Sequence, residues 1–217
     1  MSTTGPDWKK RLTDHGLDEI RRLAEARALE PRAKSFLFMR HGQTEGNAKR
    51  IFQPADIPLN QRGLEQAREA AQWVREHAPE RIVASDMLRA WQSAEVIAQS
   101  CGARPQAEPR LRERWFGDWV GTPSARFDWR DQPPNGERLA DFVARTRVGL
   151  GEVLEEETPT LVVAHGGTLY VLVYSLGVEL LESHITNATP LAFERAAGGW
   201  TVRPLAPAAV DDFSPPS

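Results

Sequence analysis

The 217-residue sequence has one cysteine, no long apolar run and no large excess of charge of either sign. Its lone cysteine, Cys101, excludes an internal disulfide framework and a cysteine-based zinc cluster, and it fits a reducing compartment. The 27 Lys and Arg residues against 30 Asp and Glu give a net charge of −3. Without a general basic field, nucleic acid is not expected as a partner.

The sequence also lacks a segment that would cross a membrane or direct secretion. Its most apolar stretch, residues 169–181, is shorter than a membrane span and contains Ser175, Gly177 and Glu179. No apolar core follows the charged residues near the N-terminus, as a secretory signal would require. We therefore expect no membrane partner and a cytoplasmic location.

The pattern of apolar residues predicts strands that alternate with helices. Short apolar strands are expected at 36–39, 81–84 and 161–164, and helices at 63–77, 87–100, 137–156 and 168–176. Residues 191–194 and 200–203 flank two glycines and are typical of an antiparallel hairpin. Residues 42–61 are expected to form a loop and 111–135 an irregular, Trp-rich segment. The alternation predicts an α/β fold, a three-layer α/β/α sandwich.

Additional segments are predicted at both ends of this domain, which spans residues 35–206. Leu17, Ile20, Leu23 and Ala24 recur at helical spacing, so residues 1–34 are interpreted as a helical extension with an apolar stripe. The stripe must pack on its own domain or on a second copy, and its length of about two turns favours its own domain. The oligomeric state, monomer or homodimer, stays open. Residues 207–217, rich in Pro and Asp, are expected to be disordered.

Two histidines, His41 and His165, each follow a short apolar strand and precede a glycine. Either one alone is most simply a strand-end residue that local hydrogen bonds satisfy. Ligands of α/β sheets bind outside the carboxyl ends of the strands, however, so a matched pair of imidazoles there favours a reaction centre.

Four short motifs occur in order along the chain: Arg40-His41-Gly42, Ser85-Asp86-Met87-Leu88-Arg89-Ala90, Leu111-Arg112-Glu113 before Phe116-Gly117-Asp118-Trp119-Val120-Gly121, and His165-Gly166-Gly167. This set resembles the histidine phosphatase superfamily, which includes cofactor-dependent phosphoglycerate mutases and small-molecule acid phosphatases. The resemblance covers roughly residues 36–203. It implies a phosphoglycerate mutase-like fold with a mostly parallel sheet.

The resemblance also implies roles for individual residues. The residues expected to carry the catalysis are Arg40, His41, Arg89, Glu113 and His165. The residues expected to bind substrate are Asn47, Gln53, Glu137 and Gly166. Among the first group, His41 is the implied nucleophile and Glu113 the implied proton donor, while the arginines and His165 hold the phosphoryl oxygens.

The residue types suit this chemistry. A neutral imidazole can attack phosphorus and form a phosphohistidine that water then cleaves. Arginine stays charged and can bind two oxygens at once. Since Arg and His supply the positive charge, neither a metal nor another cofactor is expected, and the histidine spacing is not that of a zinc protease.

Each of these residues has a structural alternative when taken alone. Arg89 could be an ion-paired helix residue, Glu113 a surface carboxylate and Asn47 a loop cap. The sequence also departs from common family strings at Val120, Pro54 and Arg138, and these departures are expected to reshape the substrate pocket.

The sequence thus predicts a metal-independent phosphomonoesterase that hydrolyses a small phosphorylated metabolite through a phosphohistidine. The alternatives are phosphotransfer of the phosphoglycerate mutase type and a non-catalytic phosphate-binding module. The segment between Glu113 and Gly136 is short and aromatic, whereas family mutases carry a longer basic segment, and this favours hydrolysis of an ester with a partly apolar leaving group. Arg114, Arg126 and Arg130 suggest a second anionic group on the substrate.

Overall fold

A single mixed sheet forms the centre of the computed structural model, which describes residues 15–205 except the side chains of 182 and 183. Within that range the sheet has six strands, in the spatial order β3 (Pro105–Ala107), β2 (Arg81–Ala84), β4 (Thr160–Ala164), β1 (Ser35–Arg40), β5 (Pro190–Ala196) and β6 (Gly199–Pro204). The first four strands pair in parallel, and β5 and β6 add antiparallel pairings at one edge. The predicted fold class and hairpin are confirmed.

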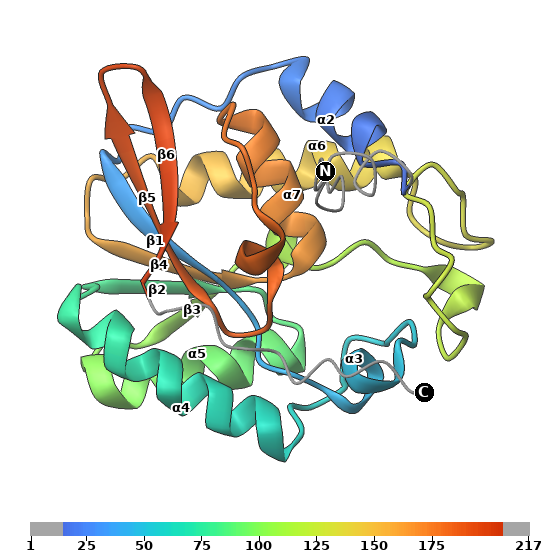
Figure 1. The fold of residues 1–217 in the computed structure, drawn as a ribbon, viewed down its shortest axis with the longest axis horizontal. Helices are drawn as coiled ribbons and strands as arrows, with labels where there is room; N and C mark the ends of the chain where they lie inside the picture. The colour runs from blue at the N-terminus through green and yellow to red at the C-terminus, as the bar shows by residue number, and fades with distance from the viewer. Residues whose placement is uncertain (1–14, 206–217) are drawn as a thin grey trace, which may run out of the picture.

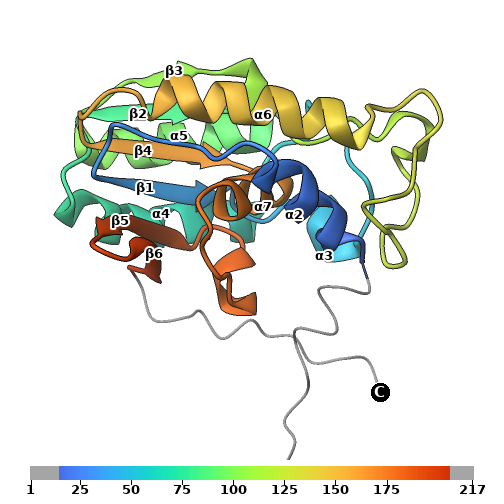
Figure 2. The ribbon, with the colours of Figure 1, turned by 90° about the horizontal axis from the view of Figure 1, so that it is seen from above.

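Helices cover both faces of the sheet (Figures 1 and 2). On one face lie α4 (Gln61–Glu76) and α5 (Leu88–Cys101), and on the other lie α2 (Leu17–Glu25), α6 (Leu139–Val153) and α7 (Gly166–Ser175). Side chains alternate along β1, so Phe36 and Phe38 join the core under α6 and α7, while Leu37 and Met39 join the core under α4 and α5. The central strand β4 is buried along its whole length because both of its faces are covered.

The N-terminal helix α2 packs against α7 and α6 of its own chain. Its apolar stripe is buried, with Leu17, Ile20 and Ala24 in the same core as the helices beneath it. This is the packing that the stripe predicts. The division of the chain at residue 34 stays a prediction, and the expected tail at 207–217 lies outside the described residues.

The prediction from the sequence missed several short elements. Residues 42–61 are not all loop, since α3 (Glu45–Lys49) begins after Thr44, whose hydroxyl accepts a hydrogen bond from the Asn47 amide. Strand β3 was not expected because it has three residues, none of them fully buried. The remaining short elements are the 3-10 helices η1 (Pro109–Leu111), η2 (Gly117–Trp119) and η3 (Glu182–Ile185). Within residues 15–205, no helix has the length and apolar character to span a membrane.

Replacing Ile20 by alanine should destabilise the protein, because the Ile20 side chain is 0% exposed in the core between α2 and α7. We expect the free energy of unfolding to fall by about 2–5 kcal/mol. Denaturant unfolding of the wild type and the variant measures this difference. A change within ±0.5 kcal/mol, typical of a surface site, would mean that α2 is not part of the folded core.

Candidate active site

The two predicted histidines meet at the carboxyl ends of β1 and β4. Their strands are adjacent and parallel, and the His41 backbone amide donates to the Ala164 carbonyl at 3.0 Å. The imidazole centroids of His41 and His165 are 5.1 Å apart, and the two residues are 3% and 0% exposed. The expectation that both imidazoles share one site is confirmed.

Hydrogen bonds define the tautomer of His41. Its Nδ1 lies 2.7 Å from the Gly42 carbonyl, which can only accept, so Nδ1 carries the hydrogen. Its Nε2 then holds a lone pair, and the Arg89 Nε–H donates to it at 3.2 Å. Burial first, and then the charges of Arg89 and Arg40, hold the pKa of His41 well below its ordinary value. The side chain is therefore a neutral imidazole with its lone pair on Nε2, where it accepts from Arg89.

Two arginines supply positive charge beside this lone pair. Arg89, on the first turn of α5, is 4% exposed and also donates to the Pro54 carbonyl at 2.9 Å. Burial lowers the pKa of Arg89 to about 10, so the guanidinium stays charged at neutral pH. Arg40 ends β1 and is oriented by the Ile185 carbonyl, to which its Nη1 donates at 2.7 Å.

The second imidazole is held by a residue that was not predicted to belong to the site. Ser85 follows β2, and its Oγ lies 2.9 Å from Nε2 of His165. That oxygen also accepts from the Met87 amide, and its hydroxyl hydrogen can donate to Nε2 when the ring hydrogen is on Nδ1. Nδ1 is buried and has no hydrogen-bond partner among the described residues. Burial, followed by the Arg89 charge, lowers the pKa of His165 as well.

Glu113 reaches the same site from the loop after η1. Its Oε2 accepts from the Gly167 amide at the start of α7, and its Oε1 accepts from the Arg114 amide, both at 3.0 Å. A Cβ on Gly167 would lie 2.1 Å from Oε1 of Glu113 and 2.8 Å from the Trp129 ring. Position 167 must therefore be glycine for the carboxylate to lie where it does.

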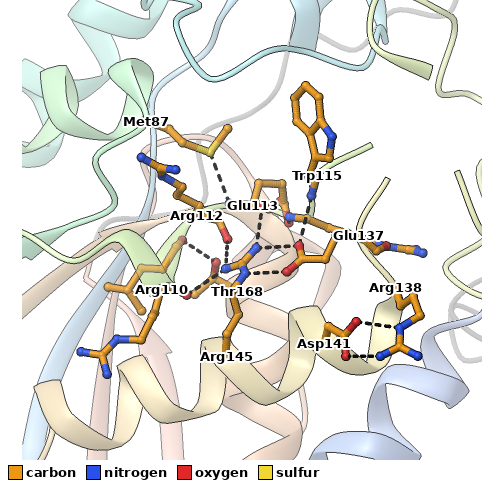
Figure 3. A network of polar contacts seen from close by, with 12 residues as sticks. Met87, Arg110, Arg112, Glu113, Trp115, Glu137, Arg138, Asp141, Arg145 and Thr168 are labelled. Carbon is orange, nitrogen blue, oxygen red and sulfur yellow. Dashed lines mark hydrogen bonds and ion pairs between the residues drawn. The ribbon is translucent and has the colours of Figure 1, made fainter. Parts of the chain in front are cut away.

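A network around Arg145 fixes the backbone that carries Glu113 (Figure 3). From α6, Arg145 donates to the carbonyl oxygens of Arg110, Arg112 and Glu113 at 2.8–3.0 Å. The Glu137 carboxylate holds the Arg145 guanidinium through two bonds of 2.7 and 2.8 Å. This bidentate geometry fixes the plane of the guanidinium and with it the turn that presents Glu113.

The structure therefore corrects the expectation that Glu137 lines the substrate pocket. Its carboxylate is committed to Arg145 and to the Trp115 amide, and Glu137 is not among the residues that surround the cavity. From the sequence, Glu137 could be recognised as a carboxylate near the aromatic segment. The sequence did not show that Arg145, on α6, would bind it.

The suggestion that Arg114 binds a second anionic group is also wrong. Arg114 is 2% exposed, and its guanidinium donates to the carbonyl oxygens of Glu137, Trp129 and Asp131. Arg130 is paired with Asp128 at 2.6 Å. Neither arginine borders the cavity, and Arg114 instead links backbone carbonyls of the aromatic segment.

Asn47 and Gln53 lie at the cavity as predicted. Oδ1 of Asn47 accepts from Thr44 and from Asn187, so the donor end of the amide is left for a ligand. The Thr44 hydroxyl binds Oε1 of Gln53. Asn187 also donates to the His41 carbonyl at 2.9 Å and was not predicted, since it is distant in sequence.

A cavity of about 300 Å³ opens above these groups. Seven of the predicted site residues line it: Arg40, His41, Asn47, Gln53, Arg89, Glu113 and Gly166. Aromatic residues form a further part of its lining, the aromatic wall: Phe52, Phe116, Phe127, Trp129 and Tyr170. Among residues 15–205, no group of three or more His, Cys, Asp or Glu could hold a metal ion. The arrangement can neutralise a small anion, attack it with Nε2 of His41 and accommodate an apolar substituent.

Comparison with known proteins agrees with this geometry. Residues 36–206 match the family model described as histidine phosphatase superfamily (branch 1). A glucosyl-3-phosphoglycerate phosphatase of Mycobacterium tuberculosis is 32% identical over 180 residues, which cover 72% of this chain and 79% of the relative. The probable phosphoglycerate mutase GpmB of Yersinia enterocolitica is 35% identical over 155 residues, covering 64% of this chain and 72% of the relative.

The fold is also similar to solved structures. The mycobacterial glucosyl-3-phosphoglycerate phosphatase complexed with VO3 aligns with a TM-score of 0.66 at 28% identity. The alignment covers 79% of this chain and 97% of that structure.

Replacing Gly167 by alanine should lower the turnover of a phosphate monoester by about 100-fold, because the new Cβ would displace Glu113 from its position. Steady-state kinetics on purified variants measures the loss. Gly166→Ala provides the comparison, since a Cβ there would only meet Arg40 at 3.8 Å and should cost much less. Equal rates for the two variants would mean that the placement of Glu113 does not matter.

Proposed function

Because the chain belongs to the histidine phosphatase superfamily and is a phosphoric monoester hydrolase, we propose that Nε2 of His41 is the nucleophile of its reaction. The observation that carries this proposal is the pair of hydrogen bonds on His41. The bond from Nδ1 to the Gly42 carbonyl leaves the lone pair on Nε2, which lies 3.2 Å from Nε of Arg89. The side chain is neutral and aligned before substrate arrives.

In the first half-reaction, Nε2 of His41 attacks the phosphorus atom and the bond to the leaving oxygen breaks. Arg40 and Arg89 neutralise the charge on the phosphoryl oxygens, and Nδ1–H of His165 donates a further hydrogen bond. The protonated carboxyl of Glu113 gives its proton to the leaving oxygen. The products are a phosphohistidine and the free alcohol.

In the second half-reaction, water attacks the phosphorus atom from the side that the alcohol has left. Glu113, now ionised, takes a proton from this water, and the bond between phosphorus and Nε2 breaks. Inorganic phosphate leaves, and both His41 and Glu113 return to their starting protonation states. No step requires a metal ion.

The substrate in this proposal is a small phosphorylated metabolite, as it is for the relatives named as glucosyl-3-phosphoglycerate phosphatases. A mutase has less support, because Arg40 and Arg89 are the only Lys or Arg residues among the described residues around the cavity, and both are needed for one phosphoryl group. A cytoplasmic location is part of the proposal, since the single cysteine suits a reducing compartment.

Replacing His41 by alanine should lower turnover by about 10³-fold or more, because no neighbouring side chain can supply the attacking nitrogen. Rapid quenching of the wild type with labelled substrate should trap protein-bound phosphate that is stable to base and labile to acid. The variant should trap none while keeping the wild-type circular dichroism spectrum. A variant with a near-normal rate would overturn the mechanism.

Replacing Glu113 by glutamine should affect substrates according to their leaving groups. An alkoxide needs a proton as it leaves, so we expect a loss of about 10²-fold or more on alkyl phosphates. An aryl oxide leaves without one, and the loss on aryl phosphates should be below about tenfold. Glu45→Gln, on the exposed part of α3, is the matched control and should change neither rate. Equal losses on both substrate types would instead make Glu113 a positioning residue.

A further inference from the structure

We propose that the substrate's leaving group is an uncharged alcohol carrying a ring, and that the cavity selects against esters with a carboxylate near the phosphate. This inference rests on the proposed function, because it assumes that Arg40 and Arg89 bind the phosphoryl group. It concerns the part of the cavity that the phosphoryl group does not fill.

The rings of the aromatic wall contact one another in a series. The ring centroids of Phe52 and Phe116 are 4.5 Å apart, those of Phe116 and Phe127 are 5.2 Å apart, and those of Phe127 and Trp129 are 5.0 Å apart. Tyr170, from α7, extends the wall, with its centroid 6.1 Å from that of Trp129. Phe127 and Tyr170 are only half-buried, so the wall is not fully covered by the rest of the protein. A flat, apolar partner would complete its packing.

The charged residues around the aromatic wall indicate which kind of leaving group is disfavoured. The cations at the cavity, Arg40 and Arg89, are those of the phosphoryl site, and the remaining charged residue there is Glu113. Arg114 follows Glu113 in the chain, but its guanidinium points into the protein and donates to backbone carbonyls. A second carboxylate on the substrate would therefore lose its hydration against aromatic rings, with no counter-ion of its own.

The edge of the wall has polar groups suited to a neutral alcohol. Asn47, Gln53 and Ser124 all border the cavity, and none carries charge. Amide and hydroxyl groups can bind the hydroxyls of a sugar or the heteroatoms of an aromatic ring. The cavity of about 300 Å³ is at the lower end of the range for small-molecule sites, which suits one ring beside the phosphate.

The test compares primary alkyl phosphates, so that leaving-group reactivity is similar and the attached group differs. The probes are 2-phenylethyl phosphate, glucose 6-phosphate, n-propyl phosphate and 3-phosphoglycerate. We expect one of the two ring esters to have the highest kcat/KM, which identifies the ring as aromatic or sugar, and to exceed 3-phosphoglycerate by about tenfold or more. A wild-type enzyme that prefers 3-phosphoglycerate, or the ring-free n-propyl ester, would overturn the proposal.

Variants of the wall test the cause of this preference. Phe127→Ala should lower kcat/KM for the preferred ring ester by about tenfold while changing n-propyl phosphate by less than about threefold. Phe127→Lys places a cation at the wall and should raise the rate on 3-phosphoglycerate relative to the ring ester. Trp73→Ala, which removes an aromatic side chain that is 37% exposed on α4 outside the cavity, is the control and should change no ratio.

Each ratio compares kcat/KM for two substrates of the same preparation of one variant. A fraction of unfolded protein therefore does not alter it. Equal losses by Phe127→Ala on both esters would contradict the proposal. Loss of the trapped phosphoenzyme in His41→Ala tests the mechanism separately, so the mechanism can stand while the inferred leaving group fails.

Discussion

The hydrogen bond from Nδ1 of His41 to the Gly42 carbonyl is the interaction on which the site depends most. It puts the lone pair on Nε2, and burial beside Arg40 and Arg89 keeps the ring neutral. The same arginines that disfavour an imidazolium favour a phosphoryl anion, so one set of charges suits both the proposed nucleophile and its target. The sheet makes this possible, because the parallel pairing of β1 and β4 brings the chain segments of His41 and His165 to one edge.

The proposed proton donor, Glu113, depends on a different set of constraints. Glu113 lies on irregular backbone, where no regular helix or strand fixes its direction. Arg145, held by Glu137, supplies that rigidity by binding three backbone carbonyl oxygens of this segment (Figure 3). Gly167 leaves room for the carboxylate at the start of α7. Arg114 secures the aromatic segment that follows. Arg145 and Arg114, of which the sequence suggested only Arg114 as an anion-binding residue, thus hold this backbone from within the protein.

Elements with a strong periodic pattern could be predicted from the sequence, and so could the residues at their ends. β4 and the histidine after it were evident because a short apolar run ends abruptly at a polar residue. The contacts of Glu137 and Arg114 could not be predicted, because a charged residue in an irregular segment carries no period that shows which way it faces. Ser85 and Asn187 were missed for a related reason: each acts through a histidine that is distant in the sequence.

The stereochemical course at phosphorus tests the central claim most directly. Attack by His41 followed by attack by water is two in-line displacements, each of which inverts the phosphorus centre. Hydrolysis of a thiophosphate monoester made chiral with two oxygen isotopes, in water of the third isotope, should therefore give inorganic thiophosphate with net retention of configuration. Net inversion would mean that water attacks the substrate directly, and His41 would then not be the nucleophile.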